Sequence, residues 1–245
     1  MRLSKRIHAL AGSVTGGHTA ADIGTDHGYV PMLLIRDGIS PRVIMSDISE
    51  GSLSKAKETF RLCGLTDRVS ESDFRIGDGL ETIAAGEVDE VIIGGLGGHT
   101  IVDILDADIE KSRSFKKLIL QPRKHSGALR YWLYVNGWDI ERECLAQEGK
   151  FVCEIIIAVP SGEECREPEF EYDDIRWKYP EYLVDIDPEL AQKRIDWKMD
   201  SIAEQIENLH NADADNNERI KPLHRDYLYL RDLVAEAEDR IKKDS

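Results

Sequence analysis

The chain has 245 residues, a hydrophobic content of 41% and a formal net charge of −15 at pH 7. This composition is typical of a globular protein rather than a disordered one, and the length is sufficient for a full hydrophobic core. No apolar run approaches the ~20 residues of a membrane-spanning helix, and the basic N-terminus lacks the apolar segment of a signal peptide. We therefore expect a cytoplasmic protein without membrane contact.

The cysteines show none of the spacings typical of metal sites, so we predict no metal. In a reducing cytoplasm they are expected to be free and mostly buried thiols. They are Cys63, Cys144, Cys153 and Cys165.

The negative charge is unevenly distributed along the chain. Residues 161–245 hold 24 Asp and Glu against 13 Lys and Arg, whereas the part before them is close to balanced. Such a shift in composition indicates a domain boundary. We predict a first domain over residues 1–160 and a second over residues 161–245.

The first part of the chain alternates between strand and helix patterns. Residues 2–11 have the spacing of a short amphipathic helix. A short apolar strand that begins at residue 19 leads into a glycine turn, and a helix follows over residues 29–35. Further strands are expected over residues 42–47, 69–76, 88–93, 117–121, 138–145 and 151–159, with helices over residues 49–63, 99–105 and 127–135. This order predicts an α/β fold with a doubly wound, Rossmann-like sheet and an antiparallel edge.

The second part of the chain has a different pattern. Residues 161–180 are polar and contain prolines, as in a linker. Asp187-Pro188-Glu189 has the chemistry of a helix start. Apolar residues then recur every three or four positions on both sides of the polar loop 211–217, which predicts an antiparallel, coiled-coil-like helical hairpin.

Four features of the first domain fall where parallel strands end, and such strands bring their carboxyl ends to one edge of the sheet. They are the turn Asp22-Ile23-Gly24-Thr25-Asp26-His27-Gly28, the pair Asp47-Ile48, the triplet Gly77-Asp78-Gly79 and the loop Gly94-Gly95-Leu96-Gly97-Gly98. Asp47 can accept hydrogen bonds from both hydroxyls of a ribose, and Asp78 from an exocyclic amine such as adenine N6. Each feature alone is also common as a simple turn or cap; together they favour a nucleoside site.

The acidic turn discriminates between nucleosides. A dinucleotide fingerprint cradles a pyrophosphate on backbone amides, but here Asp26 places a negative charge in the turn. An acid repels phosphates and suits a cation. The chain also lacks the glycine-lysine phosphate loop. S-adenosylmethionine, which carries a sulfonium and an amino group, is therefore favoured over NAD or ATP.

The same motifs resemble a known family. The run Asp22-Ile23-Gly24-Thr25-Asp26-His27-Gly28, the glycine triplet, the four-glycine loop and Gln121-Pro122 together resemble the bacterial tRNA (adenine-N1)-methyltransferases that modify adenine 22. The resemblance spans residues 1–160 and continues more weakly into the helical hairpin. It implies a class I methyltransferase fold, S-adenosylmethionine as cofactor and tRNA as substrate. Leu96 and Arg123 depart from the family, which usually has methionine and often asparagine at these positions.

The resemblance and the pattern together assign roles to residues. Cofactor binding is expected from Asp22, Gly24, Asp26, His27, Gly28, Asp47, Ile48, Gly77, Asp78, Gly79 and Gly94. At the transfer centre we expect Asp26, with His27 and Tyr29 shaping the pocket, Leu96 and Gly97 forming a wall, and Gln121 reaching the nucleotide. RNA contacts are expected from Arg2, Lys5, Arg6, Arg123, Lys124 and Arg130.

Three other functions stay open at this point. The fold could methylate another RNA or a small molecule, or it could bind RNA without catalysis. A nicotinamide dehydrogenase is the most distant, because Asp26 opposes its pyrophosphate. Oligomeric state is not encoded in any pattern that we find.

Overall fold

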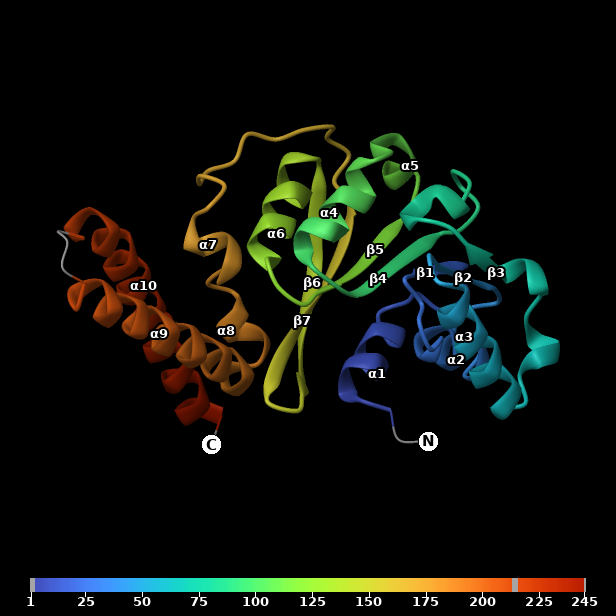
Figure 1. Ribbon diagram of the computed structural model, residues 1–245, viewed down its shortest axis with the longest axis horizontal. Coiled ribbons are helices and arrows are strands. Elements are labelled where there is room, and N and C mark those ends of the chain that lie inside the picture. Colours follow the sequence, from blue (N-terminus) through green and yellow to red (C-terminus); the bar gives the residue numbers. More distant parts are fainter. Residues whose placement is uncertain (1–2, 213–215, 245) are drawn as a thin grey trace.

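A seven-stranded sheet organises the computed structural model, which describes residues 3–212 and 216–244 (Figure 1). The strand order is β3-β2-β1-β4-β5-β7-β6. The strands are β1 (Ala20–Ile23), β2 (Val43–Asp47), β3 (Phe74–Ile76), β4 (Glu90–Leu96), β5 (Lys117–Pro122), β6 (Trp138–Glu148) and β7 (Phe151–Pro160). The first five pair in parallel, whereas β7 is antiparallel to both β5 and β6. The predicted doubly wound sheet with an antiparallel edge is confirmed.

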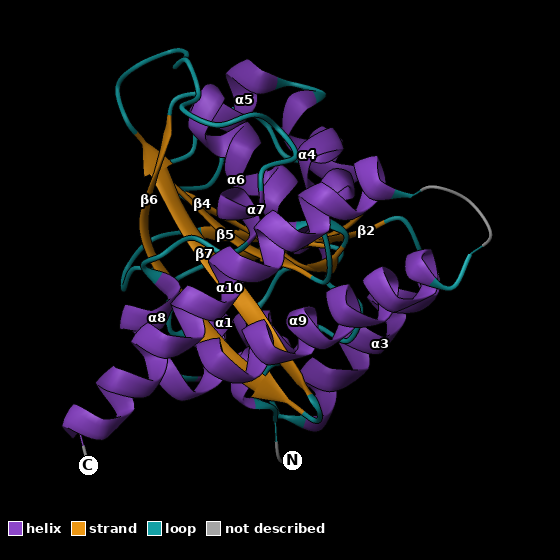
Figure 2. Cartoon of the chain, turned by 90° about the vertical axis from the view of Figure 1, so that its left-hand side faces the viewer, coloured by secondary structure: helices purple, strands orange, loops and turns teal. Residues whose placement is uncertain are grey.

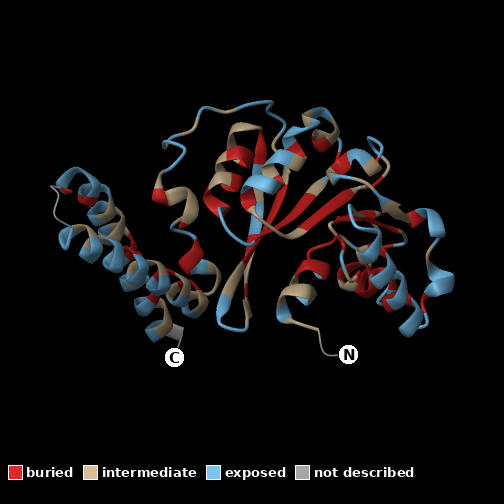
Figure 3. Ribbon diagram, in the orientation of Figure 1, coloured by how far each residue is buried: buried red, intermediate tan, exposed pale blue. Residues whose placement is uncertain are grey.

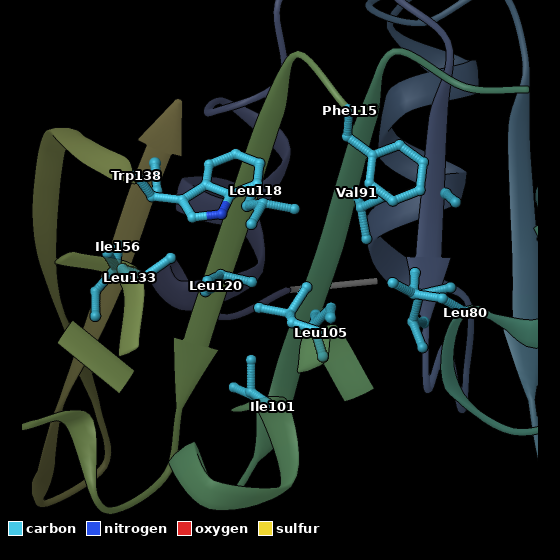
Figure 4. Packing of buried hydrophobic residues seen from close by; sticks show 14 of the residues in the cluster. Leu80, Val91, Ile101, Leu105, Phe115, Leu118, Leu120, Leu133, Trp138 and Ile156 are labelled. Atoms are coloured by element: carbon cyan, nitrogen blue, oxygen red, sulfur yellow. The ribbon is translucent and has the colours of Figure 1, made fainter. Parts of the chain in front are cut away.

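Helices cover both faces of this sheet. One face packs against α1 (Lys5–Ala11), α2 (Tyr29–Arg36) and α3 (Glu50–Leu62), and the other against α4 (Gly98–Asp106), α5 (Ile109–Arg113) and α6 (Ser126–Val135). Successive residues of a strand point to opposite faces, so Ile92 joins the first core while Val91 and Ile93 join the second. Figure 4 shows part of the second core, where Leu105 and Phe115 pack among strand residues.

Two expectations about local structure are wrong. The strand predicted over residues 69–76 shortens to β3, because Ser70 and Asp73 form a capping box around a 3-10 turn at Glu71–Asp73. The cysteines are free, but none is buried: Cys63 and Cys165 are exposed, and the other two are partly exposed.

The C-terminal part is helical, with its own core. It contains α7 (Ile175–Lys178), α8 (Leu183–Ile186), α9 (Pro188–His210) and α10 (Asn217–Asp244). The Asp187 carboxylate accepts a hydrogen bond from the Leu190 amide at 3.0 Å and caps α9 as predicted. Helices α9 and α10 lie side by side as the expected hairpin (Figures 1 and 2), with a solvent-exposed outer surface (Figure 3). No described helix is long and apolar enough to cross a membrane.

The hairpin of β6 and β7 links the two parts of the chain. β7 pairs with β5 only over 156–158, so the rest of the hairpin projects from the sheet between α1 and α9 (Figure 1). At its base, Arg130 of α6 is fully buried and donates to Glu143 at 2.6 Å and Glu154 at 2.5 Å. Arg194 of α9 donates to the same Glu154 at 2.5 Å, which ties the helical hairpin to the sheet.

Gly28 is predicted to be the most sensitive glycine of the first turn. Its φ is 64°, and a Cβ there would lie 2.9 Å from the Cβ of Ala56 on α3. Gly28→Ala should therefore lower the free energy of unfolding by about 2–4 kcal/mol, combining left-handed backbone strain with overpacking. Gly38→Ala is the matched control, because its φ is 67° and a Cβ would meet nothing within 4 Å. Denaturant unfolding should show a loss of only about 1–2 kcal/mol for the control. Equal losses in both variants would contradict the packing role.

Candidate functional site

A pocket of about 530 Å³ lies at the carboxyl ends of β1, β2 and β4, where the sequence places the glycine turns. Its lining includes most of the predicted cofactor residues: Asp22, Gly24, Asp26, His27, Asp47, Ile48, Gly77, Asp78, Gly79 and Gly94. Tyr29, Leu96, Arg6 and Arg123 complete much of the remaining wall. The parallel sheet thus gathers residues that are far apart in the sequence into one cleft.

The first turn is held by backbone hydrogen bonds to the neighbouring strand. The amides of Gly24 and Thr25 both donate to the Ser46 carbonyl, at 2.8 and 3.0 Å. Gly24, Asp26 and Gly28 have φ values of 73°, 43° and 64°, so the turn passes through the left-handed region three times. The carboxylate at residue 26 is therefore presented at the surface by a backbone that few residues adopt.

Asp47 connects two loops of the pocket. One of its carboxylate oxygens accepts from the Asp26 amide at 3.1 Å, and the other from the Ser49 amide at 2.9 Å. Each oxygen retains a second lone pair. Asp47 is thereby fixed in orientation and still able to accept two further hydrogen bonds from a ligand.

Asp22 lies at the floor of the pocket and is buried. Burial raises its pKa to about 7, although the hydroxyl of Thr25 donates to it at 2.7 Å and opposes the shift. Proximity to Asp47 adds to the increase. A carboxyl of this kind is poised to ionise when a cation binds beside it.

Asp26 lies at the rim, half exposed. Its carboxylate pairs with Lys55 of α3 at 3.1 Å and lies 3.7 Å from Nε2 of His27. The His27 ring stacks on Tyr29 with centroids 5.2 Å apart and an interplanar angle of 8°. Three of the six residues predicted for the transfer centre, Asp26, His27 and Tyr29, therefore form one contiguous surface.

Gln121 does not line this pocket but a neighbouring cavity, so its predicted contact with the nucleotide stays a prediction. Its side chain is buried, and its oxygen accepts from the Gly95 amide at 3.1 Å and from Arg6 at 3.3 Å. Its amide nitrogen donates to the Pro122 carbonyl at 3.1 Å. Gln121 thus holds the four-glycine loop, whose register shifts between Gly94 and Leu96.

Other predicted residues lie outside the pocket. Gly28 serves the packing of α2 on α3, and Gly97 is absent from the pocket lining. Arg130 is buried in its ion pairs, so its assignment as an RNA contact is wrong. Lys5 is exposed on α1, Lys124 lines a neighbouring cavity, and Arg2 lies outside the described residues.

Several lining residues were missed from the sequence. Ile7 and Leu10 of α1, and Thr100 and Ile104 of α4, also line the pocket. In the sequence these residues belong to short helices whose pattern indicates ordinary core packing. Only the tertiary fold places α1 and α4 over the strand ends. Within the described residues, no group of three His, Cys, Asp or Glu side chains is arranged to hold a metal ion.

The parallel sheet with an antiparallel edge, and the acid-lined pocket at its carboxyl-end edge, define a Rossmann-like protein with a ligand site at the ends of its strands. Residues 3–156 match the family model described as a methyltransferase domain. The chain therefore belongs to this methyltransferase domain family.

Individual relatives agree with this assignment. The tRNA (adenine(22)-N(1))-methyltransferase of Bacillus subtilis (strain 168) is 35% identical over 158 residues, which are 64% of this chain and 65% of that protein. The match thus spans just under two thirds of that relative. The crystal structure of the B. subtilis m1A22 tRNA methyltransferase TrmK superposes with a TM-score of 0.79 and 27% identity, covering 95% of this chain and 99% of that chain. A putative tRNA (m1A22) methyltransferase of Streptococcus pneumoniae, in complex with S-adenosyl-L-methionine, shares the fold with a TM-score of 0.79 and 22% identity, covering 95% of this chain and 100% of that one.

The raised pKa of Asp22 predicts a pH-dependent contribution to stability. Because the folded chain binds this proton more tightly than the unfolded chain, the contribution is fully present below pH 3.8 and is lost as the pH rises to about 7. Asp22→Asn should remove this dependence and stabilise the protein relative to wild type at pH 8, but much less at pH 5. Thermal unfolding of both proteins at the two pH values gives the measurement. If the difference in melting temperature between wild type and Asp22→Asn were the same at both pH values, Asp22 would have an ordinary pKa and the prediction would be wrong.

Proposed function

We propose that the protein transfers a methyl group from S-adenosylmethionine to N1 of adenine 22 in tRNA. The observation that carries the proposal is the pocket itself, in which Asp22, Asp26, Asp47 and Asp78 line a glycine-walled cleft at the strand ends. Such a cleft repels a pyrophosphate and attracts a cationic nucleoside. The activity of the B. subtilis relative and the ligand of the S. pneumoniae structure support this proposal.

The residues present fit this cofactor. Asp47 keeps two free acceptor positions for ribose hydroxyls. Gly77 and Gly79 flank Asp78, and a Cβ at Gly77 would lie 2.5 Å from the Thr82 side chain, so the chain at this turn has no room for a larger residue. Buried Asp22 is suited to the positively charged end of the ligand. When bound, the cofactor supplies a methyl group made electrophilic by the sulfonium.

The acceptor needs no catalytic base. N1 of adenine has a free lone pair, so no proton has to leave before attack, and the methylated ring becomes cationic. The chain must therefore hold the base in line with the methyl group and stabilise the developing positive charge. Asp26 provides a negative charge at the rim, and the stacked rings of His27 and Tyr29 offer a flat surface for an extruded base.

Basic residues beside the pocket are suited to the RNA backbone. Arg6 and Arg123 both line the pocket wall, and Lys124 and Lys5 lie nearby on exposed surfaces. Phosphate contacts of this kind position a nucleic acid without reading its sequence. Since the substrate is tRNA, we assign the protein to the cytoplasm.

The proposed function predicts a specific product. Unmodified tRNA incubated with the protein and labelled S-adenosylmethionine, then digested to nucleosides, should yield 1-methyladenosine. A transcript with guanosine at position 22 should remain unlabelled. Label in another nucleoside, in rRNA or in a metabolite pool would assign a different acceptor, and cofactor binding without any methylation would favour an RNA-binding protein.

Asp26 is predicted to act in turnover more than in cofactor binding. Asp26→Asn removes the charge near the transferred group and should lower kcat on the order of 100-fold. The Kd for S-adenosylmethionine, measured by calorimetry, should change only a few-fold because Asp22 and Asp47 remain. Asp37→Asn, an exposed carboxylate that pairs with Arg36 outside the pocket, is the control and should leave both values unchanged. An unaltered kcat in the Asp26 variant would refute this role.

A further inference from the structure

The four-glycine loop, residues 94–98, forms the pocket wall at the end of β4. Gly94, Gly95 and Leu96 all line the pocket. Glycine has more backbone freedom than any other residue, and Leu96 is the only residue of this loop with a side chain that could anchor it. The position of the loop therefore depends on the elements that pack around it.

The strand ladder is interrupted at this loop. β4 and β5 pair as far as Gly94 with Gln121, and the register shifts before Leu96 meets Pro122. Proline has no amide hydrogen, so β5 cannot donate a backbone hydrogen bond at this position. Gly95 has no partner in the ladder and turns through the left-handed region with a φ of 82°. Its amide needs an acceptor from outside the strands.

Gln121 supplies this acceptor with its side chain. Its oxygen accepts from the Gly95 amide at 3.1 Å and from Nη1 of Arg6 at 3.3 Å, which occupies both lone pairs. Its amide nitrogen donates to the Pro122 carbonyl at 3.1 Å. The side chain is fully buried. Three partners therefore fix its orientation, and the bulge at Gly95 is fixed with it.

Helix α1 contacts the same loop. Nε of Arg6 donates to Glu148, at the end of β6, at 2.9 Å, and this second bond orients the guanidinium toward Gln121. Leu10 lies one helical turn after Arg6 on the same face of α1. A Cβ at Gly94 would lie 3.3 Å from the Leu10 side chain. α1 therefore acts on both glycines of the bulge, directly through Leu10 and indirectly through Arg6.

The contact between Arg6 and Gln121 lies in the wall between two spaces. Both residues line a second cavity of about 610 Å³, and Arg6 also lines the pocket, as Arg123 does. We call this second space the basic cavity because of its lysines, which are Lys124, Lys150, Lys178, Lys193 and Lys198. A shift of the wall at Gln121 would change the shape of the pocket at the four-glycine loop.

The sheet order puts this loop to one side of the cofactor residues. The carboxylates assigned to the cofactor, Asp22, Asp47 and Asp78, lie in or shortly after β1, β2 and β3. β4 adjoins β1 on the opposite side from β2. A base that enters the pocket beside the cofactor would therefore meet the loop that follows β4.

We propose that Gln121 and Arg6 are positioning residues for the methyl-acceptor base. They fix the backbone of the four-glycine loop, and the loop holds the base in line with the methyl group. This inference rests on the proposed function for the identity of the acceptor. Alignment of this kind is sensitive, because a misplacement of about 1 Å costs on the order of 100-fold in rate. The cofactor is held by other loops, so its binding should depend little on this contact.

The test is a double-mutant cycle on kcat, measured at saturating tRNA. Gln121→Met keeps the size of the side chain but removes its hydrogen bonds, and it should lower kcat about 10- to 100-fold. Arg6→Met should lower kcat to a smaller degree. Because Arg6 acts through Gln121, the double variant should match Gln121→Met within about twofold. The Kd for S-adenosylmethionine, measured by calorimetry, should change only a few-fold in all three variants.

Arg36→Met is the matched control, because Arg36 is a half-exposed arginine of α2 that pairs with Asp37 outside both spaces. It should leave kcat and Kd unchanged. An Arg6→Met variant that raised only the KM for tRNA, in a salt-dependent manner, would identify Arg6 as a phosphate contact and overturn its positioning role. Losses in kcat that multiply in the double variant would overturn the action of Arg6 through Gln121.

Amide hydrogen exchange provides a readout that does not require activity. Peptides covering residues 94–98 should exchange roughly 5- to 10-fold faster in Gln121→Met than in wild type, because the Gly95 amide loses its acceptor. Unchanged exchange would overturn the inference whether or not the wild type methylates tRNA. Faster exchange, with no methylation by the wild type, would refute the proposed function but support the hold of Gln121 on the loop. Arg6→Met, at a partly exposed position, carries both measurements if Gln121→Met fails to fold.

Discussion

A buried guanidinium holds the two parts of this molecule in register. Arg130 lies between Glu143 and Glu154, and Arg194 of α9 reaches the second of these carboxylates from the other side. The hydroxyl of Tyr182, the residue that precedes α8, donates to Glu143 at 2.6 Å and joins the cluster. Desolvation makes such clusters weak sources of net stability, but removing one partner leaves a buried charge uncompensated. The cluster therefore acts mainly on geometry: it disfavours any arrangement in which α9 leaves the β6–β7 hairpin.

That geometry has a functional consequence at the sheet edge. The pocket is built by strand ends and needs only the first part of the chain, whereas the basic cavity needs α9 at a fixed distance from β7. Arg6 and Arg123 border both spaces, so the pocket and cavity share a wall.

Local patterns predicted the sheet and the pocket well because those features depend on short-range order. A carboxylate after each buried strand comes to one edge whenever the strands are parallel. Arg130 was misassigned because its partners lie 13 and 24 residues away, on strands whose pairing no local pattern specifies. The structural role of Gln121 was missed for a similar reason, since its side-chain oxygen accepts from the Gly95 amide, 26 residues earlier in the chain. The basic face of α9 was missed because its charges were averaged over an acidic region. The spacing of Lys193, Arg194, Trp197 and Lys198 contained the signal, since residues four apart share one helical face.

The overall acidity and the basic cavity act over different distances. Charges on the outer surface of the helical hairpin are screened within about 8–10 Å at physiological salt, so they oppose the approach of RNA weakly and do not cancel contacts inside the cavity. A polyanion that merely touches the surface meets net repulsion. One that inserts a base into the pocket places its phosphates beside cations that form no ion pair with a carboxylate of the described residues. Acidity outside and uncompensated cations inside thus favour a substrate that can present an extruded nucleotide over RNA that cannot, and the discrimination comes from geometry rather than from total charge.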